Sequence, residues 1–216
     1  METALHYAAK NNSKETVELL LSHGANINEK GDFKDTALHY AAENNSKETV
    51  EILLSHGANI NGKYKDGATA LHFAALNNSK EAAEFLISHG ISINEKDKYG
   101  KTALKNAIDF NSDETAKLLI SHGANINEKD CNGKTALHYA AEYKYKKEIV
   151  ELLISHGANI NEKDNYGQTA LHYASENNNK EIVELLISHG ANINKKDNNK
   201  DSALHTATIL LSLIHI

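Results

Sequence analysis

The sequence of 216 residues predicts an all-α repeat solenoid, in which antiparallel helix pairs stack and β-hairpin loops project from them. Two motifs that recur at a fixed spacing of 33 or 34 residues carry this prediction. A Thr-Ala-Leu motif, Ser-Ala-Leu in its last copy, begins at Thr3, Thr36, Thr69, Thr102, Thr135, Thr169 and Ser202. A Ser-His-Gly motif ends at Gly24, Gly57, Gly90, Gly123, Gly157 and Gly190. Six full units and a partial seventh are therefore expected to form one array over residues 1–216.

Each unit is expected to begin with a short helix, which the second unit illustrates. Thr36 is suited to the N-cap of a helix through Glu43, whose Leu and Ala residues lie on one face. Asn44-Asn45-Ser46 then ends that helix, because Asn tolerates the left-handed conformation. Ser46 is expected to cap the helix that follows.

A second helix and an extended loop complete the unit. In residues 48–56, Val50, Leu53 and Leu54 form a single apolar stripe at helical spacing. Gly57 lies where a glycine commonly ends a helix, and the segment after it leads into a turn. No unit of this size can bury its apolar faces alone, so neighbouring units must cover one another.

The unit Asp130–Ala141, continued by residues 149–161, resembles the ankyrin repeat, and the resemblance extends over nearly the whole chain. It implies L-shaped units stacked into a curved array, with hairpin tips and first helices on the concave side. Thr-Ala-Leu-His replaces the usual Thr-Pro-Leu-His, and Asn replaces the glycine between the helices. Each change is expected to cost about 0.4–1 kcal/mol through unfolded-state entropy or local strain.

Two local departures from the repeat predict weak points. Lys105 replaces the histidine of the first helix in the fourth unit, where a hydrogen bond between units is expected to be missing. Lys34 and Lys200 occupy loop positions that are glycine in the intervening units. If the position needs a positive φ, both lysines are strained.

The composition excludes several classes of function. A net charge of -6 and the absence of arginine argue against a nucleic-acid partner. No apolar run reaches the roughly 18 residues that membrane insertion requires. Cys131 is the only cysteine, which favours the cytoplasm or another reducing intracellular compartment.

Neither histidines nor carboxylates predict a catalytic, cofactor or metal site. The thirteen histidines fall mainly into two columns at the repeat spacing, one on each helix of the unit. Equivalent side chains of stacked helices lie about 8–10 Å apart, too far to share one zinc ion. The resemblance implies a structural role for the first column, and helix C-termini favour the second. The chain is therefore expected not to be an enzyme and to need no metal or cofactor.

The positions that vary between repeats predict the binding surface. Loop tips and first-helix ends differ from unit to unit, and aromatic residues concentrate between the fourth and fifth units. Aromatic side chains are enriched at the centres of protein interfaces. The expected partner-binding residues are Phe33, Asp66, Tyr99, Lys101, Phe110, Lys134, Tyr143 and Tyr166.

These features predict a non-enzymatic scaffold that binds a protein partner through its concave surface. One alternative is a structural spacer or tether without a specific site. Another, implied by the resemblance, is a substrate of an asparaginyl hydroxylase, which would modify loop residues like Asn28, Asn61, Asn127 and Asn161.

The last eight residues, 209–216, are almost entirely Ile and Leu and lose the repeat pattern. This apolar end is expected either to fold back over the last unit or to mediate self-association.

Overall fold

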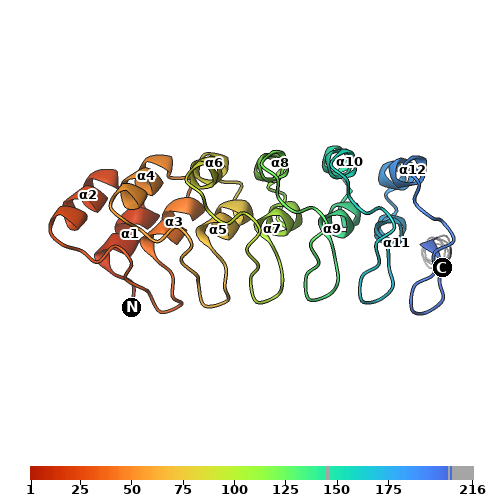
Figure 1. Cartoon of the computed structure of the whole chain (residues 1–216), viewed down its shortest axis with the longest axis horizontal. Coiled ribbons are helices and arrows are strands. Elements are labelled where there is room, and N and C mark those ends of the chain that lie inside the picture. Colours follow the sequence, from red (N-terminus) through yellow and green to blue (C-terminus); the bar gives the residue numbers. More distant parts are fainter. Residues whose placement is uncertain (145, 204, 206–216) are drawn as a thin grey trace, which may run out of the picture. The chain divides into compact units, whose positions relative to one another are not determined.

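A computed structural model describes residues 1–144, 146–203 and 205 of the chain. These residues fall into two compact units, the first spanning Met1–Ala124 and the second beginning at Asn125. Within each unit, every repeat contributes a pair of short helices and a loop that projects from them like a finger (Figure 1).

In the first unit the leading helices of the repeats pack side by side in one layer, and the second helices form another (Figure 1). The second unit repeats this arrangement. The helices of the first unit are α1 (Ala4–Lys10), α2 (Lys14–Ser22), α3 (Ala37–Glu43), α4 (Lys47–Ser55), α5 (Ala70–Leu76), α6 (Lys80–Ser88), α7 (Ala103–Asp109) and α8 (Asp113–Ser121). Those of the second unit are α9 (Ala136–Glu142), α10 (Lys147–Ser155), α11 (Ala170–Glu176) and α12 (Lys180–Ser188).

The core of each repeat is made by the residues that the periodicity selects. In the second repeat Leu38, Ala41 and Ala42 of α3 are buried, as are Val50 and Leu53 of α4. Small alanines allow the leading helices to pack closely. Each fully buried Leu or Val contributes about 1.5–3 kcal/mol, and neighbouring repeats provide the surface that covers it.

The first helix of a repeat starts at the predicted threonine, which is paired with a histidine three residues later. The backbone N–H of Thr36 donates to Nδ1 of His39 at 3.1 Å, and Thr36 Oγ1 lies 2.9 Å from the same nitrogen. The pairs Thr3–His6, Thr69–His72, Thr135–His138 and Thr169–His172 do the same. Because Nδ1 accepts, the neutral ring carries its proton on Nε2.

The Nε2 proton then bonds the first helix of a repeat to the last residue of that repeat, at the base of its finger. In His6, His72, His138 and His172 it donates to a backbone carbonyl 29 or 30 residues further along the chain, at 3.1–3.3 Å. His39 is the exception. Its Nε2 lies near the equivalent carbonyl, that of Ala68, but the geometry does not meet that of a hydrogen bond. The first histidine column is thus structural, as the sequence predicts.

The fourth repeat lacks this pair, because Lys105 stands where the histidine should be. Lys105 is buried, and Oγ1 of Thr102 is buried with no hydrogen-bond partner among the described residues. We expect Lys105→His to restore the threonine–histidine pair and to raise the unfolding free energy by about 0.5–1.5 kcal/mol. Urea unfolding measures the change, and a Lys105→Gln variant controls for loss of the ammonium group alone. A midpoint equal to or below that of wild type would contradict the expectation.

Asparagines with positive φ separate the two helices of a repeat, as predicted. Asn12, Asn45, Asn78, Asn111 and Asn178 have φ between 49° and 60°. The residue after them occupies the N-cap position, yet the predicted cap, Ser46, makes no side-chain cap hydrogen bond. Asparagines of the preceding repeat act instead: Asn45 Oδ1 accepts from the backbone N–H of Ala82, in the first turn of α6. The asparagine therefore both ends one helix and caps a helix in the next repeat.

Each finger is a tight turn closed at its base by one backbone hydrogen bond. In the third finger the N–H of Asp97 donates to the carbonyl of Lys101 at 3.0 Å, and Gly100 has a φ of 73°. The equivalent lysines also have positive φ, 63° at Lys34 and 72° at Lys200, which confirms that the turn is left-handed at this position.

We expect Lys34→Gly to stabilise the protein. A non-glycine residue in the left-handed region costs about 1–2 kcal/mol, part of which glycine returns as unfolded-state entropy, so a gain of about 0.5–1 kcal/mol should remain. Thermal unfolding of Lys34→Gly, with Lys34→Ala as the control for the lost side chain, measures it. A clear loss of stability in the glycine variant would show that the lysine side chain has a structural role.

Candidate functional site

The fingers of each unit are bonded to one another and form a continuous platform. In the first unit the N–H of Lys65 donates to the carbonyl of Phe33 at 2.8 Å, and Lys98 donates likewise to Asp66 at 2.6 Å. In the second unit Asn165 bonds to Asn132 at 2.9 Å and Asn198 to Tyr166 at 3.0 Å. The tips are therefore held at fixed spacing by the backbone, which leaves their side chains available for contacts.

A second set of bonds, from asparagine side chains, fixes the segment that leads into each finger. Asn28 Oδ1 accepts from the backbone N–H of Asn59 at 2.8 Å, and its Nδ2 donates to the carbonyl of Gly57. Asn127 and Asn161 form the same two bonds with the repeat that follows each of them. These amides hold neighbouring repeats together, so their side chains are already engaged in the frame.

Four of the predicted binding residues are aromatic side chains that lie open to solvent. Phe33, Tyr99, Phe110 and Tyr166 are exposed to 50%, 51%, 57% and 60% of their area. Phe33, Tyr99 and Tyr166 are at finger tips, and Phe110 follows the end of α7. Tyr143 and Asp66 are half-buried. Exposed aromatic rings on a rigid platform supply contact area at low entropic cost.

The predicted aromatic concentration is distributed over both units. Tyr99 and Phe110 belong to the first, and Tyr143 and Tyr166 to the second. Their assembly into one patch stays a prediction. Within the first unit the platform includes a lysine that sequence reasoning missed: Lys65 Nζ lies 3.8 Å from the ring centroid of Phe33, a cation–π distance. Residue type alone gave no signal for this contact, because it joins two fingers.

Each of the two predicted lysines is tethered to the first helix that follows its finger. Lys101 Nζ lies 2.6 Å from Asp109 Oδ2, and Lys134 Nζ lies 3.1 Å from Glu142 Oε2. Both pairs join the base of a finger to the end of the first helix, and both lysines are half-buried. Lys134 also lies over the ring of Tyr173, at 4.2 Å from its centroid. These lysines stiffen the angle between finger and helix, whatever else they contact.

Paired substitutions at the finger base and on the following helix were not predicted from the sequence. Where the finger begins with Asp164, Tyr173 donates to its Oδ2 at 2.7 Å, and Asp130 and Tyr139 form the same pair at 2.6 Å. Where the finger begins with Tyr64, the helix carries Phe73, and the two rings pack edge to face at 5.3 Å. The residue that begins a finger and the helix residue nine positions later therefore change together, so that the two side chains stay in contact.

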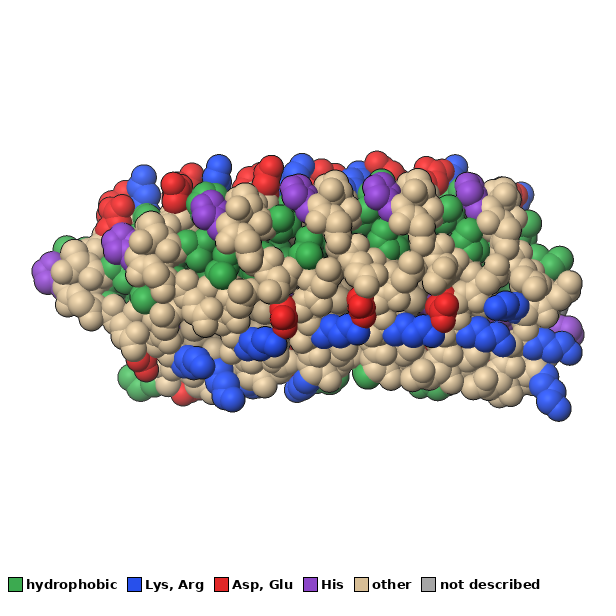
Figure 2. Space-filling view, viewed as in Figure 1, with side chains coloured by type: hydrophobic (Ala, Val, Ile, Leu, Met, Phe, Trp, Pro, Cys, Tyr) green, Lys and Arg blue, Asp and Glu red, His purple; other side chains and the backbone are tan. Residues whose placement is uncertain are grey.

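The second histidine column lies at the ends of the second helices, in a row along each unit (Figure 2). Nδ1 of His56 donates to the carbonyl of Ile52 at 2.8 Å, in addition to the backbone N–H of His56 and the hydroxyl of Ser55, so several donors converge on this carbonyl in the last turn of α4. The other members, His23, His89, His122, His156 and His189, do the same at 2.8 or 2.9 Å. Within the described residues, no three His, Cys, Asp or Glu side chains converge as metal ligands would.

Comparison with known proteins places the chain in a family. The model of the family described as ankyrin repeats (3 copies) matches residues 1–64, 61–130, 126–197 and 148–211. The chain therefore belongs to the ankyrin-repeat family. Domains of this family generally bind proteins and are typically non-catalytic.

Two solved structures show the similarity over nearly the whole chain. The crystal structure of the human ASB11 ankyrin repeat domain has a TM-score of 0.85 at 25% identity, with 95% of this chain and 92% of that one covered. The ankyrin repeat domain of Bcl-3, a member of the IkappaB protein family, has a TM-score of 0.82 at 28% identity, covering 97% and 98%. A search of curated proteins finds no match. Among the described residues, no helix is long and apolar enough to span a bilayer.

Proposed function

We propose that this chain is a non-enzymatic scaffold that binds a protein partner through its finger tips and first-helix ends. One observation carries the proposal: the finger backbones are bonded to one another, while the aromatic side chains at the tips are half or more exposed. Frame residues are buried or bonded at every repeat, so the tips are where selection for a partner can act. The expected partner-binding residues remain Phe33, Asp66, Tyr99, Lys101, Phe110, Lys134, Tyr143 and Tyr166.

The chemistry of the platform supports a protein partner over a nucleic acid. The chain carries a net charge of -6 and no arginine, and two of the lysines near the tips are paired with carboxylates. Aromatic rings next to single lysines, as at Phe33 and Lys65, suit apolar and acidic side chains of a protein surface. The lone free cysteine, Cys131, supports a reducing intracellular compartment.

The proposal treats residues 1–216 as a single array of repeats. The Thr-Ala-Leu motif keeps its spacing of 33 residues from Thr102 to Thr135, on either side of the division between the two units. Deleting one whole repeat, Thr69–Lys101, is then expected to leave a folded, shorter protein. Loss of most helical circular dichroism would argue against an array.

The test of function is capture of partners from the native cell, with three exposed rings of the first unit replaced together. Phe33→Ala, Tyr99→Ala and Phe110→Ala remove side chains that make little contact with the core. We expect a partner captured by wild type to fall at least tenfold in yield with the triple variant. The matched control is Glu18→Ala, Glu51→Ala and Glu84→Ala, exposed on the second helices of the same unit.

The same set of proteins also distinguishes the proposed function from two alternatives. A spacer without a specific site predicts identical capture by wild type and both variants. A substrate of an asparaginyl hydroxylase predicts an added oxygen in the intact mass of the native protein. The amides of Asn28, Asn127 and Asn161 already bond to the next repeat, so such a modification would act on a side chain engaged in the frame.

A further inference from the structure

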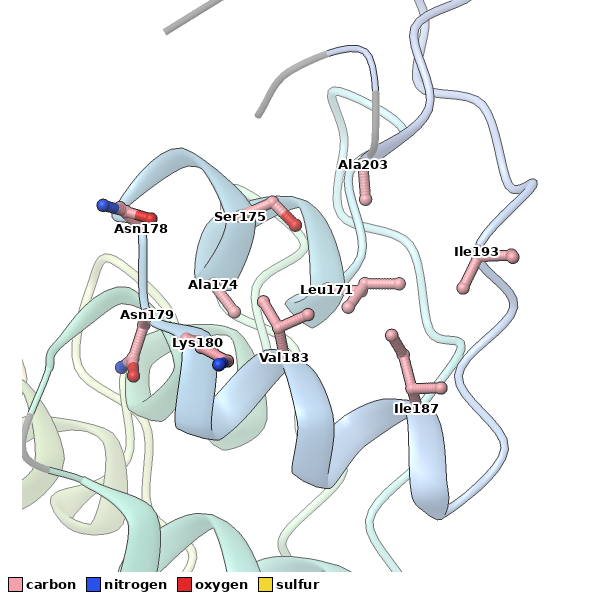
Figure 3. A pocket seen from close by; sticks show the side chains of 10 residues that line it. All are labelled: Leu171, Ala174, Ser175, Asn178, Asn179, Lys180, Val183, Ile187, Ile193 and Ala203. Carbon is pink, nitrogen blue, oxygen red and sulfur yellow. The ribbon is translucent and has the colours of Figure 1, made fainter. Parts of the chain in front are cut away.

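The far end of the second unit carries an open apolar groove. It lies between α11 and α12, has a volume of about 400 Å³, and its walls include Leu171, Ala174, Val183 and Ile187 (Figure 3). Ile187 and Ile193 are exposed to 45% and 49% of their area. Figure 3 shows these side chains turned toward the same open space.

The preceding repeat shows what such a groove normally holds. There the equivalent of Val183 is Val150, which is fully buried, and α12 packs on α10. In the last described repeat Val183 is only half-buried. The groove is therefore the place where the helices of a following repeat would pack.

The chain itself supplies a segment at this place. The described chain reaches Ala203, which lines the groove, and Ser202 Oγ lies 2.9 Å from Nδ1 of His205, as at the start of every other repeat but the fourth. Residues 209–216 follow, with the sequence Ile-Leu-Leu-Ser-Leu-Ile-His-Ile. They include no Asp, Glu or Lys, whereas each second helix of the array has three such residues on its solvent side.

We propose that residues 209–216 of this chain bind back into the groove between α11 and α12. The segment is eight residues long, close to the nine of α12, and a helix of eight residues spans about 12 Å. Its apolar character on all sides fits a cavity lined by Leu, Val, Ile and Ala better than it fits solvent. In the groove it covers the apolar side chains that a following repeat covers elsewhere in the array.

Cysteine crosslinking in the full chain tests the proposal. Cys131→Ser removes the only native thiol, Ile187→Cys places a thiol at the groove, and a second cysteine is scanned through Leu210, Leu211, Leu213 and Ile214. We expect at least one pair to form an intrachain disulfide at least ten times faster than the same tail cysteine paired with Ile154→Cys. Ile154 is the matched control, because it is the equivalent of Ile187 in the preceding repeat. Because the reaction is intramolecular, its rate should be the same at about 5 µM and at about 100 µM protein.

Two results of the crosslinking would overturn the proposal. Disulfides that form mainly between chains, at a rate that rises with concentration, would make a second copy the occupant of the groove. Four tail positions that react no faster with Ile187→Cys than with the control would place the tail elsewhere. A chain ending at Thr208 gives an independent measure: we expect several-fold higher fluorescence of an apolar dye and a lower Tm. No change in either quantity would also contradict the proposal.

Discussion

Lowering the pH from 7 to 5 is expected to reduce the unfolding free energy of residues 1–124 strongly, because of the buried histidines of the first helices. Burial lowers the pKa of His39 from 6.5 to about 4 and lowers the pKa of His72 as well. Both rings accept a backbone N–H at Nδ1, so a proton added there would also break the cap. The histidines therefore stay neutral in the folded state while they become charged in the unfolded chain.

The direction of the effect follows from proton binding. Above pH 6.5 these histidines are neutral in both states, and their contribution to stability is fully present. As the pH falls below 6.5 the unfolded state binds protons that the folded state does not, and stability is lost until the pH reaches the folded pKa. For His39 the shift from 6.5 to about 4 corresponds to about 3 kcal/mol between pH 7 and pH 4.

The unfolding free energy of the second unit should depend less on pH. Burial lowers the pKa of His138 in this unit. Burial also raises the pKa of Glu176, so that carboxyl group takes up a proton in the folded state first and offsets part of the loss. In the first unit burial lowers the pKa of both His39 and His72, and each proton that the folded state excludes costs at most about 1.4 kcal/mol per pH unit.

Hydrogen exchange at pH 7, 6 and 5, read separately for α3–α6 and α9–α12, measures both units in one experiment. Replacing the exposed His56 with Gln is the control, because its Nδ1 bonds to a carbonyl at a helix end and not to a cap. The His56→Gln variant should leave the steep loss of stability in the first unit in place, whereas His72→Gln should reduce the pH dependence of the first unit. Equal slopes in wild type and His72→Gln would refute the assignment.

The sequence predicted the repeat frame well because the frame is written in local contacts. The threonine at the start of the first helix, the asparagine turn and the left-handed position of Lys34 depend on residues within a few positions of each other. Periodicity across the array makes each of these signals recur, which separates them from chance.

Contacts between repeats were harder to predict, because residue type does not reveal which partner a side chain reaches. Ser46 was expected to cap α4 but makes no side-chain cap hydrogen bond, and the preceding repeat reaches this turn instead: Asn12 Oδ1 accepts from Oγ1 of Thr49 on α4. Lys101 was expected at the partner surface, and its ammonium group is paired with Asp109 on the first helix of the following repeat. The predicted apolar end, residues 209–216, lies outside the described residues, so both of its expected roles remain predictions.

Gly167→Ala is expected to destabilise the protein by about 2–4 kcal/mol, the combined cost of strain and of a close contact between fingers. Gly167 has a φ of 77°, a region that an L side chain enters at a cost of about 1–2 kcal/mol. A Cβ there would also lie 2.9 Å from the backbone N of Asn198 and 2.6 Å from its Oδ1. The backbone of Asn198 cannot yield freely, because its N–H donates to the carbonyl of Tyr166.

Gly67→Ala separates the two costs, because it shares the turn but not the close approach. Gly67 has a φ of 86°, and the nearest atoms to its Cβ position lie at 3.6 Å, an ordinary contact distance. This variant should therefore lose only the strain, about 1–2 kcal/mol. Urea unfolding of both variants, followed by circular dichroism, gives the difference. If Gly67→Ala and Gly167→Ala cost the same, the spacing between fingers is not set by backbone contact. A larger loss at Gly167 would mean that neighbouring fingers are held at the shortest distance that a glycine allows, and that the exposed tips inherit their spacing from it.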